Sequence, residues 1–253
     1  MTPPEIKPGL INPDVKKLEA MGRLSAKVSH DINNILGAIE GYSTLILNTL
    51  KEDDPLKPDL EEIRRAVARA AALTKALLMF SRKQVLSKKP CDLNAAAERA
   101  KEAAAPLNGP GVSVELDLEP GLPALPADQA QLDQLLNVLI LNARDAMPTG
   151  GLIRLATRAV TLKPEEVRSR DPREAGLKFA LLSVKDGGRG MAAETLERIF
   201  EPFFTTKPKG QGTGLGLSAV YGAVNQHNGW LTVRTEEGKG TEFQIYLPAA
   251  PAI

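Results

Sequence analysis

A chain of 253 residues is long enough for two folded modules, and 25% charged with 43% hydrophobic residues is an ordinary soluble composition. The formal net charge of +1 gives no general attraction to nucleic acid or anionic membrane, so an anionic ligand needs a local site. The sequence has no apolar run near the roughly 20 residues that span a bilayer, no signal-peptide pattern, and a single cysteine, Cys91, which excludes an internal disulfide. We therefore expect a cytoplasmic protein that binds no nucleic acid.

A long helix is predicted over residues 14–50, after a proline-rich lead-in at residues 1–13 that is expected to be disordered. At about 100° per residue its apolar residues form one stripe roughly 80° wide. The stripe consists of Met21, Leu24, Val28, Ile32, Ile35, Ile39 and Ile46. His30, one of two histidines, points away from this stripe, and Asn34 lies within about 40° of it. From its position relative to the apolar stripe alone, His30 is interpreted as a solvated surface histidine.

A second helix is predicted over residues 59–81, after a turn at residues 51–58 with two prolines and three acids. Its apolar and small residues also follow one side: Leu60, Ile63, Val67, Ala71, Thr74, Leu78 and Ser81. Two long antiparallel helices cannot bury such faces alone. The sequence therefore predicts a helical hairpin over residues 14–88 that forms a homodimer, closing a four-helix bundle.

Residues 89–253 contain shorter elements and predict a second module. The expected elements are helices over 93–105, 128–147 and 214–228, strands over 112–118, 152–161 and 179–186, and a hairpin over 230–247. Helices mixed with an antiparallel or mixed sheet predict a two-layer α+β sandwich. His227, at the end of the helix over 214–228, is expected to be structural, because a cation suits the helix dipole there.

Three segments of this module have the residues of a nucleotide site. In Asp186-Gly187-Gly188-Arg189-Gly190, a carboxylate that can accept a hydrogen bond from an amino group stands beside glycines that permit close backbone approach. A plain hairpin turn explains the same letters equally well.

The second segment, residues 210–217, is a glycine run that leads into a helix, with Lys207 and Lys209 upstream. Free amides at a helix N-terminus bind phosphates, although the segment lacks the Gly-Lys-Ser/Thr of a P-loop. The third segment holds Asn142, Arg144 and Asp145 after an apolar run. The Asn142 carboxamide oxygen can ligate Mg²⁺, and a hydrogen bond in helix packing is the competing explanation.

Together with the His30 segment, these motifs resemble the H, N, first glycine, F and second glycine boxes of bacterial two-component sensor histidine kinases. The motifs are His30-Asp31-Ile32-Asn33-Asn34, Asn142-Ala143-Arg144-Asp145-Ala146-Met147, Asp186-x-Gly188-x-Gly190-Met191, Phe200-Glu201-Pro202-Phe203-Phe204 and Gly212-x-Gly214-Leu215-Gly216-Leu217. The likeness runs from about residue 14 to residue 248, and the H and N motifs look like the branch that often feeds phosphorelays.

The resemblance implies a dimerisation and phosphoacceptor hairpin followed, over residues 89–253, by an ATP-binding sandwich of the GHKL (Bergerat) type. ATP and Mg²⁺ are the implied cofactors. Asp186 would bind the adenine amino group, Gly188, Gly190 and Thr241 would line the base pocket, and Asn142 would hold Mg²⁺. The other implied nucleotide-binding residues are Asp145, Lys207, Gly212, Thr213, Gly214, Leu215, Gly216 and Leu217. An ATP lid would cover residues 191–213, with Phe203 and Phe204 as its anchors.

By the same resemblance, the chain would move the γ-phosphoryl group of ATP to His30 and then to an aspartate of a separate response regulator receiver domain. Asp31 would orient the imidazole and accept its proton, and Asn34 would position water when the partner is dephosphorylated. The alternatives are a histidine phosphotransfer protein, which should have lost the glycine motifs, and a non-catalytic ATP-binding dimeric scaffold. The scaffold stays open because Val138 stands where the family has an asparagine, four residues before Asn142.

Overall fold

The computed structural model describes residues 5–6, 15–51, 54–78, 86–105, 111–161, 178–208 and 212–249. In its first two helices, side chains are described at residues 32–51, 54–68, 70–71 and 74. None of the helices in these ranges is long and apolar enough to cross a membrane. The chain divides into two compact units, one of residues 14–84 and one of residues 1–13 with 85–253.

The unit of residues 14–84 is a helical hairpin of α1 (Val15–Thr49) and α2 (Lys57–Leu78). Arg64 Nε donates to Glu40 Oε1 at 3.1 Å across the two helices. Ser43, Val67 and Thr74 are buried in this unit. The periodicity of the apolar residues therefore predicted both helices. The predicted end of the second helix, at residues 79–81, lies outside the described residues.

The second unit contains a six-stranded sheet in the order β1-β7-β8-β6-β5-β3. β3 runs parallel to β5, and the other neighbours are antiparallel. The strands are β1 (Glu5–Ile6), β3 (Val112–Leu118), β5 (Gly151–Thr161), β6 (Lys178–Asp186), β7 (Trp230–Glu236) and β8 (Gly240–Pro248). The lead-in was expected to be disordered, but Glu5–Ile6 pair with β7 as an edge strand.

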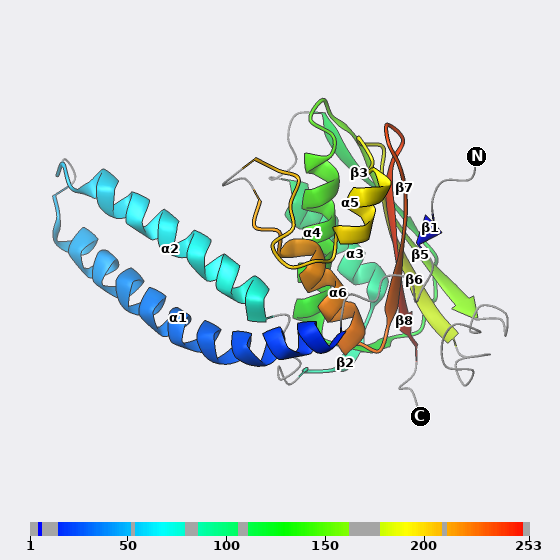
Figure 1. Cartoon of the computed structure of the whole chain (residues 1–253), viewed down its shortest axis with the longest axis horizontal. Helices are drawn as coiled ribbons and strands as arrows, with labels where there is room; N and C mark the ends of the chain where they lie inside the picture. The colour runs from blue at the N-terminus through cyan, green and yellow to red at the C-terminus, as the bar shows by residue number, and fades with distance from the viewer. Residues whose placement is uncertain are drawn as a thin grey trace. The chain divides into compact units, whose positions relative to one another are not determined.

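Three helices, α3 (Leu93–Ala104), α4 (Gln129–Asp145) and α6 (Gly216–Gln226), lie on one face of the sheet (Figure 1). In α4, Leu132, Leu136 and Leu139 recur every three or four residues and are buried, so one side of the helix packs on the sheet. Asp128 caps α4 by accepting a hydrogen bond from the N–H of Gln131 at 3.2 Å. The two-layer arrangement is the α+β sandwich that the sequence predicts.

Three short elements were not predicted. β2 (Lys89–Cys91) and β4 (Leu125–Ala127) pair as a separate two-stranded sheet, and α5 (Ala193–Arg198) is a six-residue helix. Elements of three to six residues are too short to display a hydrophobic period, so only their tertiary pairing defines them.

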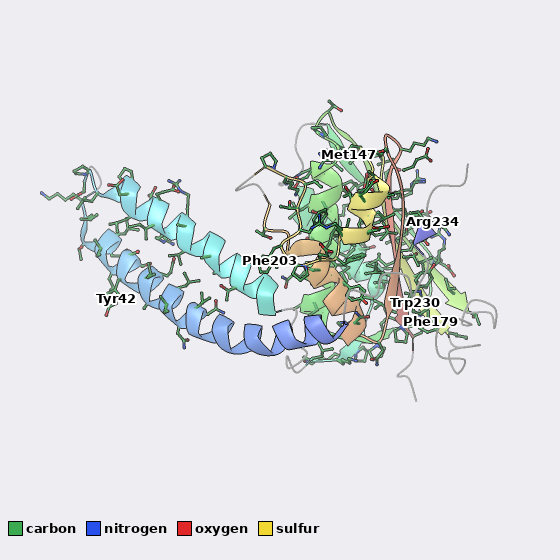
Figure 2. All side chains as sticks on the ribbon, in the orientation of Figure 1. Tyr42, Met147, Phe179, Phe203, Trp230 and Arg234 are labelled. Carbon is green, nitrogen blue, oxygen red and sulfur yellow. The ribbon has the colours of Figure 1, made fainter. Side chains whose placement is uncertain are left out.

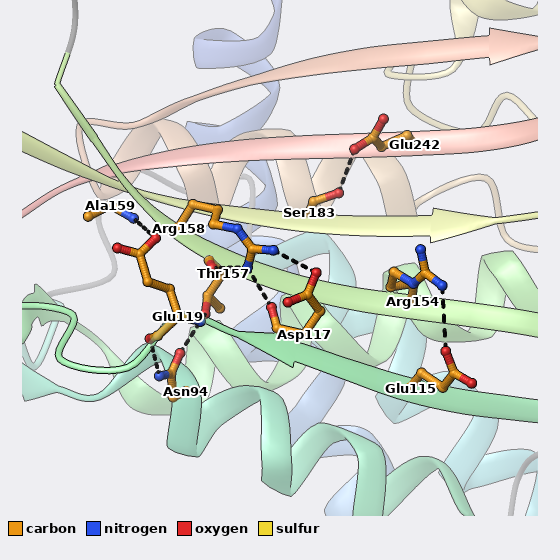
Figure 3. A network of polar contacts seen from close by, with 10 residues as sticks. All are labelled: Asn94, Glu115, Asp117, Glu119, Arg154, Thr157, Arg158, Ala159, Ser183 and Glu242. Carbon is orange, nitrogen blue, oxygen red and sulfur yellow. Dashed lines mark hydrogen bonds and ion pairs between the residues drawn. The ribbon is translucent and has the colours of Figure 1, made fainter.

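A polar network joins α3 to the two strands at the β3 edge of the sheet (Figure 3). Asn94 Nδ2 donates to the carbonyl of Glu119 at 2.8 Å, and Thr157 Oγ1 donates to Asn94 Oδ1 at 2.6 Å. Arg158 forms an ion pair with Asp117 at 2.6 Å between the paired strands. These bonds fix the edge against which α3 packs.

Trp230, the chain's single tryptophan, belongs to an aromatic cluster at one end of the sheet (Figure 2). Its ring stacks on Tyr246 with centroids 4.5 Å apart and meets the Phe179 ring edge-on at 4.7 Å. Tryptophan fluorescence therefore reports the folding of the sheet unit alone.

His227 joins the end of α6 to the beginning of α4. Its Nε2 accepts a hydrogen bond from the N–H of Asp128 at 2.9 Å, and its Nδ1 lies 2.8 Å from the carbonyl of Ala223. Burial lowers the pKa of His227 below its ordinary value, although the bond to Ala223 opposes this shift. The structural role expected for His227 is therefore present, but the ring acts as a neutral acceptor and not as a cation on the helix dipole.

The same Asp128 receives the segment that leads from the hairpin into the sheet unit. Its Oδ2 accepts a hydrogen bond from the N–H of Ser87 at 3.0 Å, while Oδ1 caps α4. One carboxylate thus ties the connecting segment to the N-terminus of α4.

Replacing His227 with Phe should destabilise the sheet unit by about 1–3 kcal/mol near pH 7.5, because the N–H of half-buried Asp128 loses its acceptor. The difference should shrink near pH 5.5. A lowered native pKa makes the wild type lose stability as the pH falls from about 6.5 through that pKa, and the variant has no such group.

Urea unfolding followed by Trp230 fluorescence measures both effects. His30→Gln, at the chain's other histidine and in the other unit, is the control and should leave this transition unchanged. An equal destabilisation of His227→Phe at both pH values would contradict the neutral-acceptor role.

Candidate functional site

The C-terminal half of α4 forms one wall of the predicted nucleotide site. A methyl group added to Gly216 would lie 3.1 Å from Val138 Cγ1 and 4.0 Å from Asn142 Nδ2, so the first residue of α6 rests on this part of α4. The Asn142 side chain is half-buried and has no hydrogen bond with any described residue. Val138, where the family has an asparagine, lies on the same side of the helix as Asn142.

The N-terminus of α6 has no side-chain cap from the described residues. Leu215, the residue before the helix, is buried and makes no side-chain capping bond. Uncapped amides at this end leave donors available to an anion. Thr213 Oγ1 instead accepts from the N–H of Leu215 at 3.2 Å, which shapes the turn just before the helix. Leu217 is half-buried in the first turn.

The second glycine motif contacts the F motif through the backbone. The N–H of Phe203 donates to the carbonyl of Gly214 at 3.0 Å, and both residues have positive φ, 68° and 65°. A methyl group on Gly214 would lie 2.3 Å from the carbonyl carbon of Phe203. Only glycine fits at position 214, because both the backbone conformation and the space exclude a side chain.

The anchor expected for the lid is corrected by the structure. Phe203 is 59% exposed, whereas Phe200 is buried and packs on Tyr221 with ring centroids 5.4 Å apart. Phe204 is half-buried under the guanidinium of Arg198, 4.3 Å from its ring centroid. Burial therefore assigns the apolar anchor of this segment to Phe200.

Lys207, in the segment predicted as the lid, reaches α4. Its Nζ donates to Asp145 Oδ2, and Arg144 Nη2 donates to Asp145 Oδ1 at 2.6 Å. Burial of Asp145 alone would raise its pKa, but the hydrogen bonds and charges of Lys207 and Arg144 hold that pKa below its ordinary value. Asp145 is therefore a carboxylate already neutralised by two cations. Gly212 packs on the Lys207 side chain, since an added methyl group would lie 3.1 Å from Cδ.

Asp186 ends β6 at the other end of the site. Its Oδ1 accepts hydrogen bonds from the N–H of Gly188 at 2.8 Å and of Thr241 at 3.3 Å, while Oδ2 has no hydrogen bond with a described residue. Burial raises the pKa of Asp186, and these two bonds oppose the rise. The chain thus holds a desolvated carboxylate with one oxygen available as an acceptor.

The glycines of the first glycine motif are required by close backbone contacts. A methyl group on Gly188 would lie 2.6 Å from the carbonyl oxygen of Ala146 at the end of α4, and one on Gly190 would lie 2.0 Å from that of Glu236. Gly190 also has φ of 64°. The loop is therefore clamped between α4 and the β7–β8 hairpin, which excludes a freely projecting hairpin turn.

Thr235 is a site residue that the sequence did not indicate. Its Oγ1 accepts from the N–H of Met191 at 3.0 Å, donates to the carbonyl of Gly240 at 3.0 Å, and lies 3.1 Å from Thr241 Oγ1. It joins the predicted lid to the strand that carries Thr241. A threonine in a strand has no local signal for this role, because its partners come from other segments.

The predicted nucleotide residues therefore converge on the end of α4: the Asp186 loop at Ala146, Lys207 at Asp145 and the beginning of α6 at Asn142. The residues predicted for the phosphoacceptor site are in the hairpin. His30 and Asp31 lie in α1 with side chains outside the described residues, and Asn34 is exposed on α1. All three belong to the other unit.

Comparison with protein families decides the class of the chain. Residues 20–85 match the His Kinase A (phospho-acceptor) domain, and residues 127–251 match the histidine kinase-, DNA gyrase B- and HSP90-like ATPase family. The chain is a two-component histidine kinase catalytic core. The helical region and the sandwich of this kinase core are thus the phosphoacceptor and ATPase folds that the motifs predict.

Curated relatives agree with this assignment. The kinase core is 42% identical over 234 residues to the sensor kinase CckA of Brucella abortus (strain 2308), covering 92% of the chain and 25% of the relative. It is 32% identical over 231 residues to the sensory histidine kinase/phosphatase NtrB of Rhodobacter capsulatus, covering 90% of the chain and 62% of the relative. The kinase core therefore spans only part of the length of these relatives.

A solved structure supports the fold. The crystal structure of full-length ShkA in complex with AMPPNP aligns with a TM-score of 0.71 at 24% identity, covering 89% of the kinase core and 45% of ShkA. At this identity the likeness is one of fold.

Replacing Gly190 with Ala should destabilise the sheet unit by about 1–2 kcal/mol from the backbone conformation alone, with a further cost from the contact to Glu236. Gly187→Ala in the same loop is the control, because an added methyl group there meets nothing within 4 Å. Thermal unfolding and titration with a fluorescent ATP analogue should separate the two variants. If the two variants had the same thermal stability and the same nucleotide affinity, the result would contradict the close packing of this loop.

Proposed function

We propose that this kinase core autophosphorylates on His30 with ATP and passes the phosphoryl group to an aspartate of a separate receiver domain. The observation that carries the proposal is the convergence of the Asp186 loop, Lys207 and the uncapped N-terminus of α6 on the end of α4. This convergence supports a nucleotide site in which the adenine and phosphate ends both adjoin α4.

The adenine end of the proposed site is Asp186 with Gly188, Gly190 and Thr241 around it. The free Oδ2 is an acceptor for an exocyclic amino group, which adenine has and guanine lacks at the corresponding position. Burial strengthens discrimination, because an unmatched polar group would be left without a partner in a desolvated pocket.

The phosphate end of the proposed site consists of the first turn of α6, the residues 212–217 before and within it, and Lys207. Asn142 fits as a magnesium ligand, because its carboxamide supplies a hard oxygen donor, has no hydrogen bond with a described residue and lies beside Gly216. Mg²⁺ usually takes only one or two protein oxygens when substrate phosphates and water supply the rest. When bound, the ion would neutralise charge that develops on the transferring phosphoryl group.

In the proposed reaction, a ring nitrogen of His30 attacks the γ-phosphorus of ATP while the bond from that phosphorus to the bridging oxygen of ADP breaks. The product is a phosphoramidate, and Asp31 accepts the proton that the imidazole loses. Neutral histidine has the required lone pair near pH 7. The protein mainly positions the reactants, as is general for phosphoryl transfer.

Asn34 is the residue that we assign to the reverse chemistry, in which water attacks the phosphorylated receiver domain. It is exposed on α1, one turn after His30 in the helix. The NtrB relative, which is described as both kinase and phosphatase, supports a dual activity.

We also propose that the kinase core is a homodimer. Ile35 and Tyr42 on α1 are 61% and 70% exposed in the single chain, with Ile32, Ile39 and Ile46 completing a row at intervals of three and four residues. A row of this spacing is the pattern of a helix that packs in a bundle. A second copy of the hairpin would cover it and close four helices.

Incubation with γ-labelled ATP and Mg²⁺ tests the kinase proposal. The wild type should acquire label that is acid-labile and base-stable, as a phosphoramidate is, and His30→Ala should acquire none while still binding nucleotide. Binding without labelling in the wild type would overturn the kinase activity and favour a scaffold. Labelling from a phosphorylated receiver domain but not from ATP would indicate a phosphotransfer protein.

Asp186→Asn serves as the matched control for the ATP site. It should fold, because the amide oxygen can still accept from Gly188 and Thr241, but bind ATP at least about tenfold more weakly, since its amide presents a donor to the adenine amino group. In the wild type, ATP affinity should decline as the pH falls through the raised pKa of Asp186.

Tyr42→Glu should convert the dimer to a monomer, because a charge in a packed apolar row is costly to bury. Light scattering after size exclusion measures the change. Lys51→Glu, at an exposed position beyond the end of α1, is the control and should stay dimeric. A dimeric Tyr42→Glu protein would contradict the assignment of this face.

A further inference from the structure

Asp145 occupies the nucleotide end of α4 but its oxygens are already engaged. Oδ2 accepts from Lys207 Nζ, and Oδ1 accepts from Arg144 Nε at 2.9 Å and Nη2 at 2.6 Å. The side chains of Asp145 and Lys207 are 29% and 28% exposed, so the pair lies at the edge of the site where water only partly screens it. A carboxylate in this state has little capacity left to ligate a nucleotide or a metal.

The position of the pair relates it to the phosphate end of the site. Asp145 follows Asn142 by three residues, which places both side chains on one face of α4. Gly216, the first residue of α6, rests on that face at Asn142. Asp145 therefore holds the Lys207 ammonium close to one helical turn beyond the proposed magnesium ligand.

Lys207 keeps donor capacity when it is bound to Asp145. An ammonium group has three N–H donors, and Asp145 is its hydrogen-bond partner among the described residues. The stem of the side chain is confined as well, because Gly212 packs on Cβ and Cδ and the N–H of Lys207 donates to Thr205 Oγ1 at 3.1 Å. The lysine is thus fixed in direction with two donors remaining.

The local charge also favours this arrangement. Arg144, Lys207 and Asp145 together carry a net charge of +1, so the cluster stays attractive to a triphosphate with the carboxylate present. Without Asp145, a flexible lysine would have to be ordered by the nucleotide itself, and the entropy of ordering would oppose binding.

We propose that Asp145 is a positioning residue that holds Lys207 in place for the terminal phosphate of ATP, and that it does not itself ligate nucleotide or metal. This inference rests on the proposed function of the site. It replaces the direct nucleotide-binding role that the family resemblance implies for Asp145.

The proposal predicts a specific pattern in nucleotide affinity. Asp145→Asn should weaken binding of the non-hydrolysable triphosphate AMPPNP about five- to twentyfold and change ADP affinity less than twofold, because only the terminal phosphate uses Lys207. Lys207→Met should show the same pattern, and the double variant should be no worse than either single variant. Asp145→Glu should recover most of the loss.

Asp133→Asn is the matched control. Asp133 is on the same helix and forms an ion pair with Arg99 at 3.1 Å, and its hydrogen-bond partners among the described residues, Arg99 and Gln129, are not residues of the proposed site. This variant should bind both nucleotides as the wild type does. Trp230 fluorescence checks that each variant is folded, and Lys207→Met, in the lid, tests the proposal independently if Asp145→Asn does not fold.

The outcomes separate this inference from the proposed function. If the wild type binds ATP and labels His30 but Asp145→Asn resembles Asp133→Asn, the positioning role is overturned and the kinase function stands. An equal loss of ADP and AMPPNP affinity would indicate a merely structural role. Tighter AMPPNP binding by Asp145→Asn would show that the ion pair restrains Lys207 from the nucleotide, which also overturns the proposal. If the wild type binds no ATP, the proposed function itself fails.

Discussion

The packing of three separate loops on the C-terminal turns of α4 is the constraint on which this site depends. Gly188 meets the carbonyl of Ala146, Lys207 meets Asp145, and Gly216 meets Val138 and Asn142. Each contact needs either a missing side chain or an opposite charge at one position. The helix itself is held by its buried leucines on the sheet, so the geometry of the site follows from the hydrophobic packing of one helix.

The long elements were predictable because their apolar periods are sustained over many turns or strand residues. The helix expected over residues 128–147 is α4, and the strand expected over residues 112–118 is β3. β2 and β4 escaped prediction because three residues carry no period and their pairing joins segments more than 30 residues apart. The lead-in was expected to be disordered because it is rich in proline and polar residues, whereas Glu5–Ile6 form a strand by pairing with β7.

The candidate residues of the sandwich were found from local motifs, while their partnerships were not. Gly190 and Gly214 could be selected as candidates from the sequence motifs. The backbone that a side chain at each position would clash with belongs to another segment, so the sequence did not reveal it. Thr235 was missed because its partners, Met191 and Gly240, are contributed by two other segments. Phe203 was chosen as an anchor over Phe200 because a sequence of aromatic residues does not reveal which ring is buried.

Asp128 contacts both Ser87 and His227, so it links two other segments to the beginning of α4. α4 is 17 residues long, about 25 Å, with Asp128 before its first turn and Asn142 near its last. The polypeptide that arrives from the phosphoacceptor hairpin is hydrogen-bonded at one end of this rod, and the proposed triphosphate site lies at the other. A displacement of the connecting segment that moves Asp128 would therefore act on the same helix that carries Asn142, the proposed magnesium ligand.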